Sequence, residues 1–284
     1  MPIGRRILEL RRPRRRLAAM VAAAAMVLGT AADAQIVQTR DSVRYAAGAR
    51  HTLDIYRPEK AGAPVIVFIY GGSWQNGDKS TYSFLGRALA QRGYLTIIPN
   101  YRVYPQVRYP AFLEDAAKAV RWARDNAARL GGDAGNIYLA GHSAGAYNAA
   151  MLTYDPRWLR AVGLSQRQIA GFIGLAGPYD FLPLRNETLA AIFGGANRPE
   201  TQPISYASRR APPSLLLAGA LDTTVEPSNS TRLAAALRAA GNQVTLRRYA
   251  AVGHVTILGG FGTPVELLAP VRDDIDAFIA ATRR

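Results

Sequence analysis

Apolar residues along this chain gather in short runs, and longer amphipathic stretches separate these runs. Six runs rich in β-branched residues recur after residue 40, at 64–70, 94–99, 137–140, 169–175, 214–218 and 243–249. Each run is almost continuously apolar instead of alternating with polar positions, which is typical of strands buried on both faces of a parallel sheet. Upstream, residues 35–44 and 52–56 are predicted to pair as an antiparallel hairpin.

Between these runs, apolar residues recur every three or four positions, as on one face of a helix. One helix is predicted to end at Gly131, and another to run from near Pro227 to Gly241. A last helix is predicted to open with a capping box at residues 263–266 and to bury Leu268, Val271, Ile275 and Phe278. Strands that alternate with helices predict an α/β fold, with a mostly parallel central sheet and helices on both faces. The chemistry of such folds lies at the carboxyl ends of the strands.

The first 34 residues have the order of a secretory signal. Seven arginines lie within residues 5–16, an uncharged apolar run follows at 17–28, and Ala32-Asp33-Ala34 supplies a cleavage site. The apolar run is shorter than the roughly 20 residues that span a bilayer, although a membrane anchor or a mitochondrial presequence is the alternative. We expect a bacterial protein cleaved after Ala34 and located in the periplasm or secreted. The mature chain, residues 35–284, is then a single domain without a stable membrane anchor.

The formal net charge of +15 does not by itself indicate nucleic-acid binding. The one dense group of arginines belongs to the predicted signal, and no block of like charges follows it. A generally basic surface without nucleic-acid binding is therefore the interpretation. Cysteine is absent, which excludes disulfides, thiolate metal sites and a cysteine nucleophile. The only histidines are His51, His142 and His254, so a histidine-rich zinc site is not expected.

A G-x-S-x-G pattern at residues 141–145 follows one apolar run and precedes a helix of small residues. The pattern alone is a weak signal, but a strand before it and a helix after it are the context that a nucleophile elbow requires. The sharp turn forces Ser143 into a strained backbone, which the flanking glycines permit. The N–H of Ala144 would then lie at a helix N-terminus and face a developing oxyanion. We predict Ser143 as the nucleophile and Ala144 as an oxyanion donor.

A serine nucleophile needs a base, and elimination among the three histidines selects His254. His142 neighbours the nucleophile on the turn, so its side chain should point elsewhere, and His51 at the early hairpin suits a surface or strand-end role. Asp222 follows the run at 214–218 and is the predicted acid, because the order Ser…Asp…His is the one that this kind of sheet uses. Asp180 is the alternative acid, one strand too early.

The loop after the first apolar run is rich in glycine. Gly71 and Gly72 would let the backbone approach a tetrahedral oxygen with exposed N–H groups, so both are predicted oxyanion donors. Trp74 is a candidate for the substrate pocket, although a packing role is equally consistent with its position. No metal and no organic cofactor is expected.

With these motifs the chain resembles the α/β-hydrolase superfamily, and within it the bacterial carboxylesterases and kynurenine-formamidase-like enzymes that carry an H-G-G-x-W loop followed by G-D-K. The resemblance covers roughly residues 50–282 and is carried by the segments 71–74, 77–79, 141–145, 177–180, 222–225 and 253–254. It departs at Tyr70, where the family has a histidine that orders the loop. The segment at about 178–212 is too long for a simple connection, so we expect a small cap after the elbow.

The resemblance implies a serine esterase that acts on small or aryl esters through an acyl-enzyme. An amide hydrolase of the arylformamidase or peptidase type is an alternative on the same residues. About 250 residues leave no room for the extra domain of prolyl-type peptidases, and export argues against a cytosolic formamidase. A non-catalytic binding protein with the hydrolase fold is a second alternative, against which the presence of all three expected residues argues.

Overall fold

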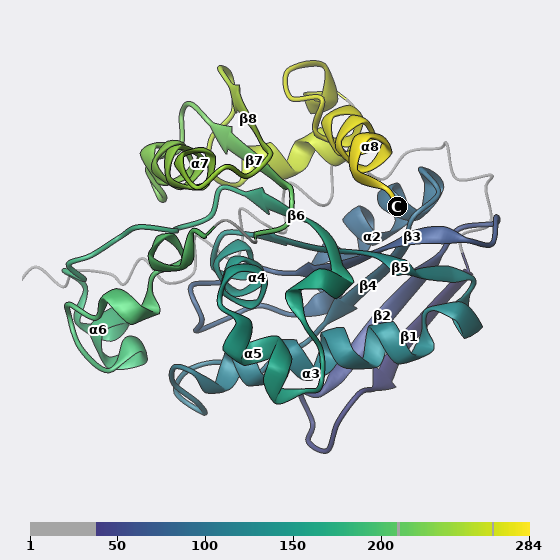
Figure 1. Ribbon diagram of the computed structural model, residues 1–284, viewed down its shortest axis with the longest axis horizontal. Coiled ribbons are helices and arrows are strands. Elements are labelled where there is room, and N and C mark those ends of the chain that lie inside the picture. Colours follow the sequence, from purple (N-terminus) through teal and green to yellow (C-terminus); the bar gives the residue numbers. More distant parts are fainter. Residues whose placement is uncertain (1–37, 209–210, 263) are drawn as a thin grey trace, which may run out of the picture.

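The computed structural model of the protein describes residues 38–208, 211–262 and 264–284, and these segments share one eight-stranded sheet (Figure 1). The strands are β1 (Gln38–Arg44), β2 (Thr52–Arg57), β3 (Ala63–Ile69), β4 (Leu95–Pro99), β5 (Gly132–His142), β6 (Ile169–Leu175), β7 (Ser214–Gly219) and β8 (Val244–Tyr249). Their spatial order is β1-β2-β4-β3-β5-β6-β7-β8. The pairs β1/β2 and β2/β4 are antiparallel, and the other pairs are parallel. The predicted α/β fold, with its starting hairpin, is confirmed.

Helices cover both faces of this sheet, as predicted. They are α2 (Ser83–Gln91), α3 (Ala111–Asn126), α4 (Ala144–Tyr154), α5 (Pro156–Ala161), α6 (Glu187–Phe193), α7 (Ser228–Ala239) and α8 (Val271–Thr282). α3 packs with α4 and α5 on one face, whereas α2 and α8 both contact a 3-10 helix, η6 (Thr256–Phe261), on the other (Figure 1). Reversal of the strand order at β3 places α2 and α3 on opposite faces, since crossovers between parallel strands are right-handed.

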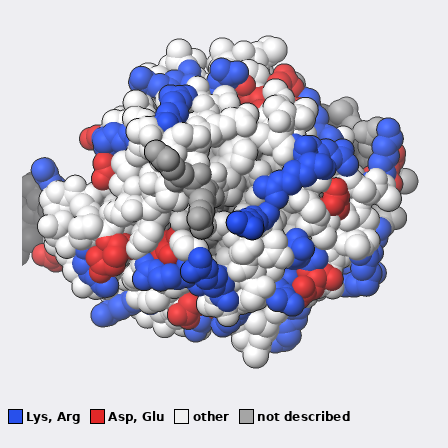
Figure 2. Space-filling view, viewed as in Figure 1, with Lys and Arg blue, Asp and Glu red and all other residues white. Residues whose placement is uncertain are grey.

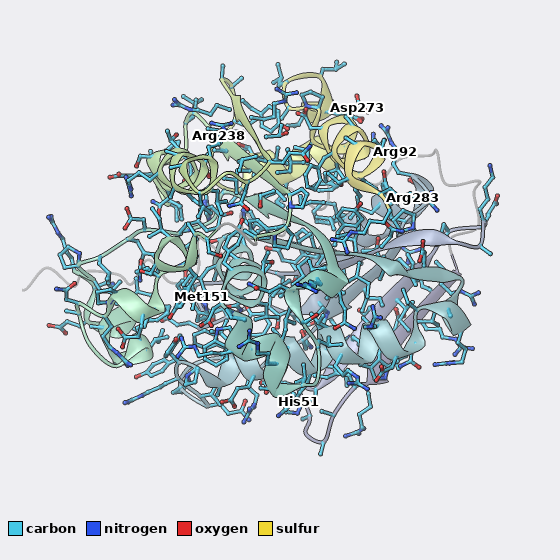
Figure 3. All side chains as sticks on the ribbon, in the orientation of Figure 1. His51, Arg92, Met151, Arg238, Asp273 and Arg283 are labelled. Carbon is cyan, nitrogen blue, oxygen red and sulfur yellow. The ribbon has the colours of Figure 1, made fainter. Side chains whose placement is uncertain are left out.

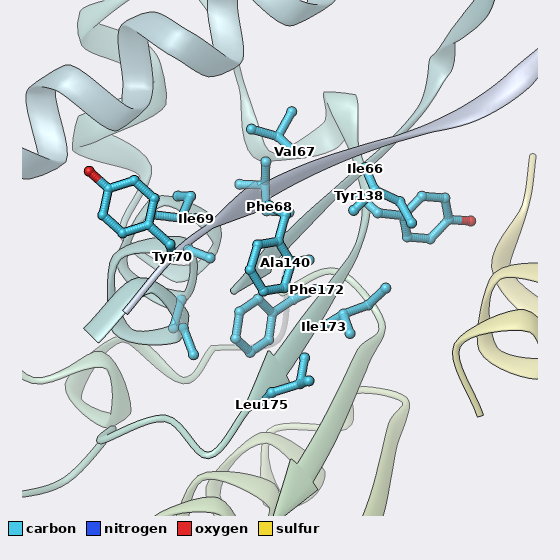
Figure 4. Close-up of a cluster of buried hydrophobic side chains, with 14 of the residues drawn as sticks. Ile66, Val67, Phe68, Ile69, Tyr70, Tyr138, Ala140, Phe172, Ile173 and Leu175 are labelled. Carbon is cyan, nitrogen blue, oxygen red and sulfur yellow. The ribbon is translucent and has the colours of Figure 1, made fainter. Parts of the chain in front are cut away.

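The centre of the sheet explains the continuous apolar runs. Every residue of β3 and β6 is buried, and Figure 4 shows several of them in a cluster of buried hydrophobic side chains. Phe172 of β6 packs against Tyr154 of α4 on one face of the sheet, and Tyr138 of β5 packs against Phe278 of α8 on the other. The edge strand β8 differs, because Arg247 and Arg248 are exposed there. The apolar run at 243–249 thus identified a strand correctly but overstated how deeply it is buried.

Charged side chains are distributed over the surface rather than gathered in one field. On the face in Figure 2, lysines and arginines form several separate groups with aspartates and glutamates among them. Arg92, directly after α2, bridges to Asp273 and Asp276 of α8 at 2.9 and 2.7 Å, and Figure 3 shows Arg92 and Asp273 side by side. In the part of the chain that the structure describes, no helix is long and apolar enough to cross a membrane.

The last helix begins later than the pattern predicts. α8 starts at Val271, after Pro270, and the short 3-10 helix η7 (Val265–Leu267) precedes it. A proline in a helix interior removes a hydrogen bond and clashes with the preceding turn, so the helix starts only after Pro270. Leu268 therefore lies outside the helix and is 58% exposed, which makes its predicted burial wrong. Val271, Ile275 and Phe278 are buried as predicted. Thr263 of the predicted capping box lies outside the described residues.

The segment expected to form a cap contains α6 and two 3-10 helices, η4 (Pro199–Thr201) and η5 (Pro203–Tyr206). Figure 1 shows α6 at one end of the molecule, away from the sheet. The predicted signal at residues 1–34 lies outside the described residues.

Candidate active site

The turn between β5 and α4 holds Ser143 in a strained backbone conformation. Ser143 has a φ of 55° and a ψ of −126°, and holding a residue with a side chain in such a region costs about 1–3 kcal/mol. A Cβ on Gly141 would lie 2.4 Å from the carbonyl oxygen of Gly145, and a Cβ on Gly145 would lie 1.9 Å from that of Ile69. Only glycine fits at both flanking positions, so the local sequence permits the sharp turn.

Ser143, His254 and Asp222 form one hydrogen-bonded chain at the carboxyl ends of β5, β8 and β7. Nε2 of His254 lies 2.8 Å from Oγ of Ser143, and Nδ1 lies 2.8 Å from Oδ2 of Asp222. The alternative acid, Asp180, instead forms an ion pair with Arg232 at 2.5 Å. The structure thus brings together the three side chains that the sequence selects.

The surroundings of Asp222 keep its carboxylate ionised. Oδ1 accepts the backbone N–H groups of Thr224 and Val225 at 2.9 and 2.8 Å. Burial by itself raises the pKa of Asp222, but the hydrogen bonds from His254 and from the two N–H groups outweigh it, so the pKa lies below its ordinary value. An ionised carboxylate can accept hydrogen bonds but cannot donate them. Nδ1 of His254 therefore carries the proton, and Nε2 faces Ser143 as an acceptor.

The glycine loop lies directly against the elbow. A Cβ on Gly71 would be 2.9 Å from Cβ of Ser143. The N–H of Gly71 donates to Oη of Tyr82 at 3.3 Å, so it is not free to act as the oxyanion donor that the sequence suggests. Across the described ranges, the N–H groups of Gly72 and Ala144 donate to no protein group. Of the three expected donors, the geometry leaves these two available.

Tyr70, at the position where the resemblance predicts a histidine, is part of an aromatic stack. Its ring stacks on Tyr101 at a centroid distance of 4.7 Å, and its hydroxyl accepts a hydrogen bond from Nη2 of Arg50 at 2.6 Å. The same Nη2 donates to the carbonyl oxygen of Gly77 at 2.8 Å. Burial raises the pKa of Tyr70 to about 12, against the effect of Arg50, so the phenol keeps its proton. Arg50 therefore joins the two ends of the glycine loop.

Trp74 is a packing residue in this structure, since its side chain is only 3% exposed. Its Nε1 donates to Oδ1 of Asn148 in α4 at 3.0 Å. Phe181 stacks on the indole, and Tyr147 and Phe193 meet it edge-on. The indole thus fastens the glycine loop to α4 and to the segment that contains α6.

The other two histidines are both buried and make polar contacts with distant parts of the chain. His142 contacts the backbone of His254 and the hydroxyl of Tyr82. His51 lies at a strand end, directly before β2, which is one of its two predicted places, but it is buried and not at the surface, with Nε2 2.9 Å from Oδ1 of Asp115. Asp115 lies in α3, and only the tertiary fold brings it to the hairpin, so no local pattern could predict this burial.

Comparison with known proteins agrees with this arrangement. The model of the BD-FAE family matches residues 53–237. The chain is 30% identical over 271 residues to the probable isoprenylcysteine alpha-carbonyl methylesterase ICME of Oryza sativa, which covers 84% of this chain and 66% of that protein. It is 29% identical over 240 residues to the esterase LipC of Mycobacterium tuberculosis, covering 76% of this chain and 59% of that protein. The chain thus spans no more than about two thirds of the length of these curated relatives.

Two solved structures have a similar fold. A truncated carbohydrate esterase from gut microbiota superposes with a TM-score of 0.77 at 22% identity, covering 90% of this chain and all of that one. Esterase B from Lactobacillus rhamnosis has a TM-score of 0.79 at 21% identity, covering 93% and 92%. At these identities the likeness shows a shared α/β-hydrolase fold.

Proposed function

Since the chain belongs to the BD-FAE family, we propose that it is a serine hydrolase that cleaves carboxylic esters through an acyl-enzyme intermediate. The observation that carries the proposal is the unbroken chain of hydrogen bonds from Oγ of Ser143 through His254 to Asp222. The names of the relatives, which are esterases and methylesterases, support ester cleavage over amide cleavage. The proposed substrate is therefore a small-molecule carboxylic ester.

In the first proposed step, Ser143 attacks the ester carbonyl while Nε2 of His254 accepts its proton. Asp222 remains ionised and holds the imidazole through Nδ1, which stabilises the imidazolium that forms. His254 then gives the proton to the departing alcohol oxygen. In the second step, His254 takes a proton from water while the water oxygen attacks the acyl carbonyl. His254 then returns that proton to Oγ of Ser143 as the acid leaves.

The proposed oxyanion donors are the backbone N–H groups of Gly72 and Ala144. The N–H of Ala144 lies at the first residue of α4, where the helix dipole favours negative charge. Gly72 belongs to the loop that follows β3 and lies directly against Ser143. Donors fixed in the backbone need no reorganisation as charge develops on the oxygen.

We also propose that residues 178–212 act as the cap and limit the size of the substrate. In support, Phe181 stacks on Trp74 and the carbonyl of Thr201 accepts a hydrogen bond from the hydroxyl of Tyr147 in α4. These contacts hold the segment against the helix that starts at the nucleophile.

The test is covalent labelling with a fluorophosphonate, followed by hydrolysis of nitrophenyl esters of increasing acyl length. We expect labelling of the wild type and none of Ser143→Ala, with turnover of the shorter esters. An N-formylkynurenine arm tests the amide alternative, and faster turnover of that amide than of any ester would reassign the substrate class. Absence of labelling in folded wild type would mean that the protein is not a serine hydrolase.

We further propose export with cleavage after Ala34, on the sequence of residues 1–34 alone. N-terminal sequencing of protein recovered from the periplasm or medium of a bacterial host should begin at Gln35. Recovery only in the cytoplasm, beginning at Met1, would exclude export.

A further inference from the structure

A continuous set of hydrogen bonds connects the glycine loop to the loop that contains the base, His254. The N–H of Gly71 lies 3.3 Å from Oη of Tyr82, and that oxygen lies 3.2 Å from Nδ1 of His142. Nε2 of His142 then lies 2.8 Å from the backbone carbonyl oxygen of His254. Tyr82 ends the 3-10 helix η1 (Lys79–Tyr82), and His142 ends β5.

The chemistry of the partners fixes the direction of every bond. A carbonyl oxygen only accepts, so Nε2 of His142 must carry a proton. Burial lowers the pKa of His142 to about 3, so the ring is neutral at physiological pH and its Nδ1 is bare. The hydroxyl of Tyr82 therefore donates to Nδ1, and its oxygen accepts the N–H of Gly71. Burial also raises the pKa of Tyr82 to about 12, which keeps that proton in place.

His254 needs this support because it lies outside regular structure. His254 lies in the loop between β8 and η6, yet its ring must contact Ser143 and Asp222 at the same time. The bond from His142 holds the backbone of that same residue, and the two imidazole rings lie 4.9 Å apart. His142 itself belongs to the elbow and is only 4% exposed.

We infer that His142 and Tyr82 form a positioning relay that holds the glycine loop and the base as one unit. The inference rests on the proposed function, because it assigns roles relative to Ser143 and His254. Both residues are positioning residues, since their polar atoms bind protein groups and not the reacting atoms. The relay also explains why Gly71, although it lies against Ser143, is not an oxyanion donor.

The first test removes one hydroxyl. Tyr82→Phe should lower kcat for a short nitrophenyl ester about tenfold, which corresponds to one neutral hydrogen bond. KM should change less than about twofold, since substrate binding does not use the relay. Tyr154→Phe is the matched control, because Tyr154 is also buried. Among the described residues its hydroxyl bonds Oγ of Ser214 alone, at 2.9 Å, at the far end of α4. We expect kcat of that variant within about twofold of wild type; equal effects of the two variants would overturn the relay.

The second test separates the two bonds of His142. In His142→Gln the amide nitrogen can reach the position of Nε2 and donate to the carbonyl of His254. In His142→Asn the shorter amide can meet Tyr82 only. We expect His142→Gln to retain kcat within about fivefold and His142→Asn to lose about 10- to 100-fold. Equal kcat in the two amide variants, or a larger kcat in His142→Asn, would refute the assignment.

A spectroscopic readout does not depend on activity. The mature protein has three histidines, so nitrogen-15 imidazole spectra of labelled wild type can resolve each ring. We expect His142 to stay neutral, with its proton on Nε2, from pH 5 to 8. A proton on Nδ1 would overturn the relay even if the variants fail to fold. Wild type that carries the His142 proton on Nε2 but hydrolyses no ester would refute the proposed function and leave the hydrogen-bond network standing.

Discussion

Replacing Gly72 with alanine tests the oxyanion assignment most directly. Gly72 has a φ of +134°, and a Cβ there would lie 2.1 Å from the carbonyl oxygen of Asn76. Real Cβ contacts are essentially never shorter than 3.0 Å, so the loop must open by about 3.0 − 2.1 = 0.9 Å. Gly77 follows Asn76 and is bonded to Arg50 through its carbonyl, which restricts where the loop can move. The N–H of Gly72 must then shift relative to Ser143.

The size of the effect follows from this displacement. A misplacement of about 1 Å in a reacting geometry costs about 10²-fold in rate, and loss of one oxyanion donor costs about 10²–10³ in kcat, or roughly 2.7–4 kcal/mol. We therefore expect kcat of Gly72→Ala to fall by about 10²–10³. KM should change less than about threefold, because the bond strengthens mainly as charge develops on the oxygen.

The assay is steady-state hydrolysis of a short-chain nitrophenyl ester, with circular dichroism as the check on folding. Gly241→Ala is the matched control, since Gly241 also has a positive φ, of +82°, but a Cβ there would meet nothing within 4 Å. It should lose about 1–2 kcal/mol of stability from left-handed strain and keep its kcat. A folded Gly72→Ala that retains kcat within tenfold would place the oxyanion donors elsewhere.

Four other outcomes are expected. Ser143→Ala, His254→Ala and Asp222→Asn should each lower kcat about 10³-fold or more in nitrophenyl ester assays, and their effects should not add, because the three act as one unit. Ser143→Gly should melt roughly 2–8 °C above Ser143→Ala in thermal denaturation, because glycine relieves about 1–2 kcal/mol of the strain at φ 55°. Tyr70→His should keep kcat within about tenfold in the same ester assay, since the ring orders the loop without chemistry. The pKa of His142 falls from 6.5 in the unfolded chain to about 3 in the folded protein. The contribution of neutral His142 to stability is therefore complete above pH 6.5 and declines as the pH falls. The urea midpoints at pH 7 and pH 5 should differ less in His142→Gln than in wild type.

Local patterns were sufficient for the elements that place the site. Continuous apolar runs identified the parallel strands, and a glycine on each side of Ser143 identified a turn that no other residue could form. Because parallel strands end at one edge of the sheet, the ends of β5, β7 and β8 had to lie near one another. Those two facts bring Ser143, Asp222 and His254 within reach without any knowledge of the tertiary packing.

What the sequence could not supply are contacts between segments with no shared pattern. Pro270 determines where α8 begins, yet the helical spacing of apolar residues continues from Leu268 across this proline without a break. His51 contacts Asp115, which lies 64 positions later in the chain (115 − 51). Tyr82 contacts His142, which lies 60 positions later. A buried polar side chain is specified by its partner, and the partner is known only when the fold is known.

The glycine loop shows how a departure from the family pattern can be absorbed. The hydroxyl of Tyr70 meets Arg50 from the β1–β2 hairpin at 2.6 Å. Nε of Arg50 also donates to the carbonyl of Tyr101 at 2.7 Å, and the hydroxyl of Tyr101 donates to the carbonyl of Tyr70 at 2.9 Å. Both the entry to the loop and its exit at Gly77 are therefore fixed from one guanidinium group. With tyrosine at position 70, Ser143, His254 and Asp222 still form their hydrogen-bonded chain, so the loop does not need a histidine at this position for the elbow to meet its partners.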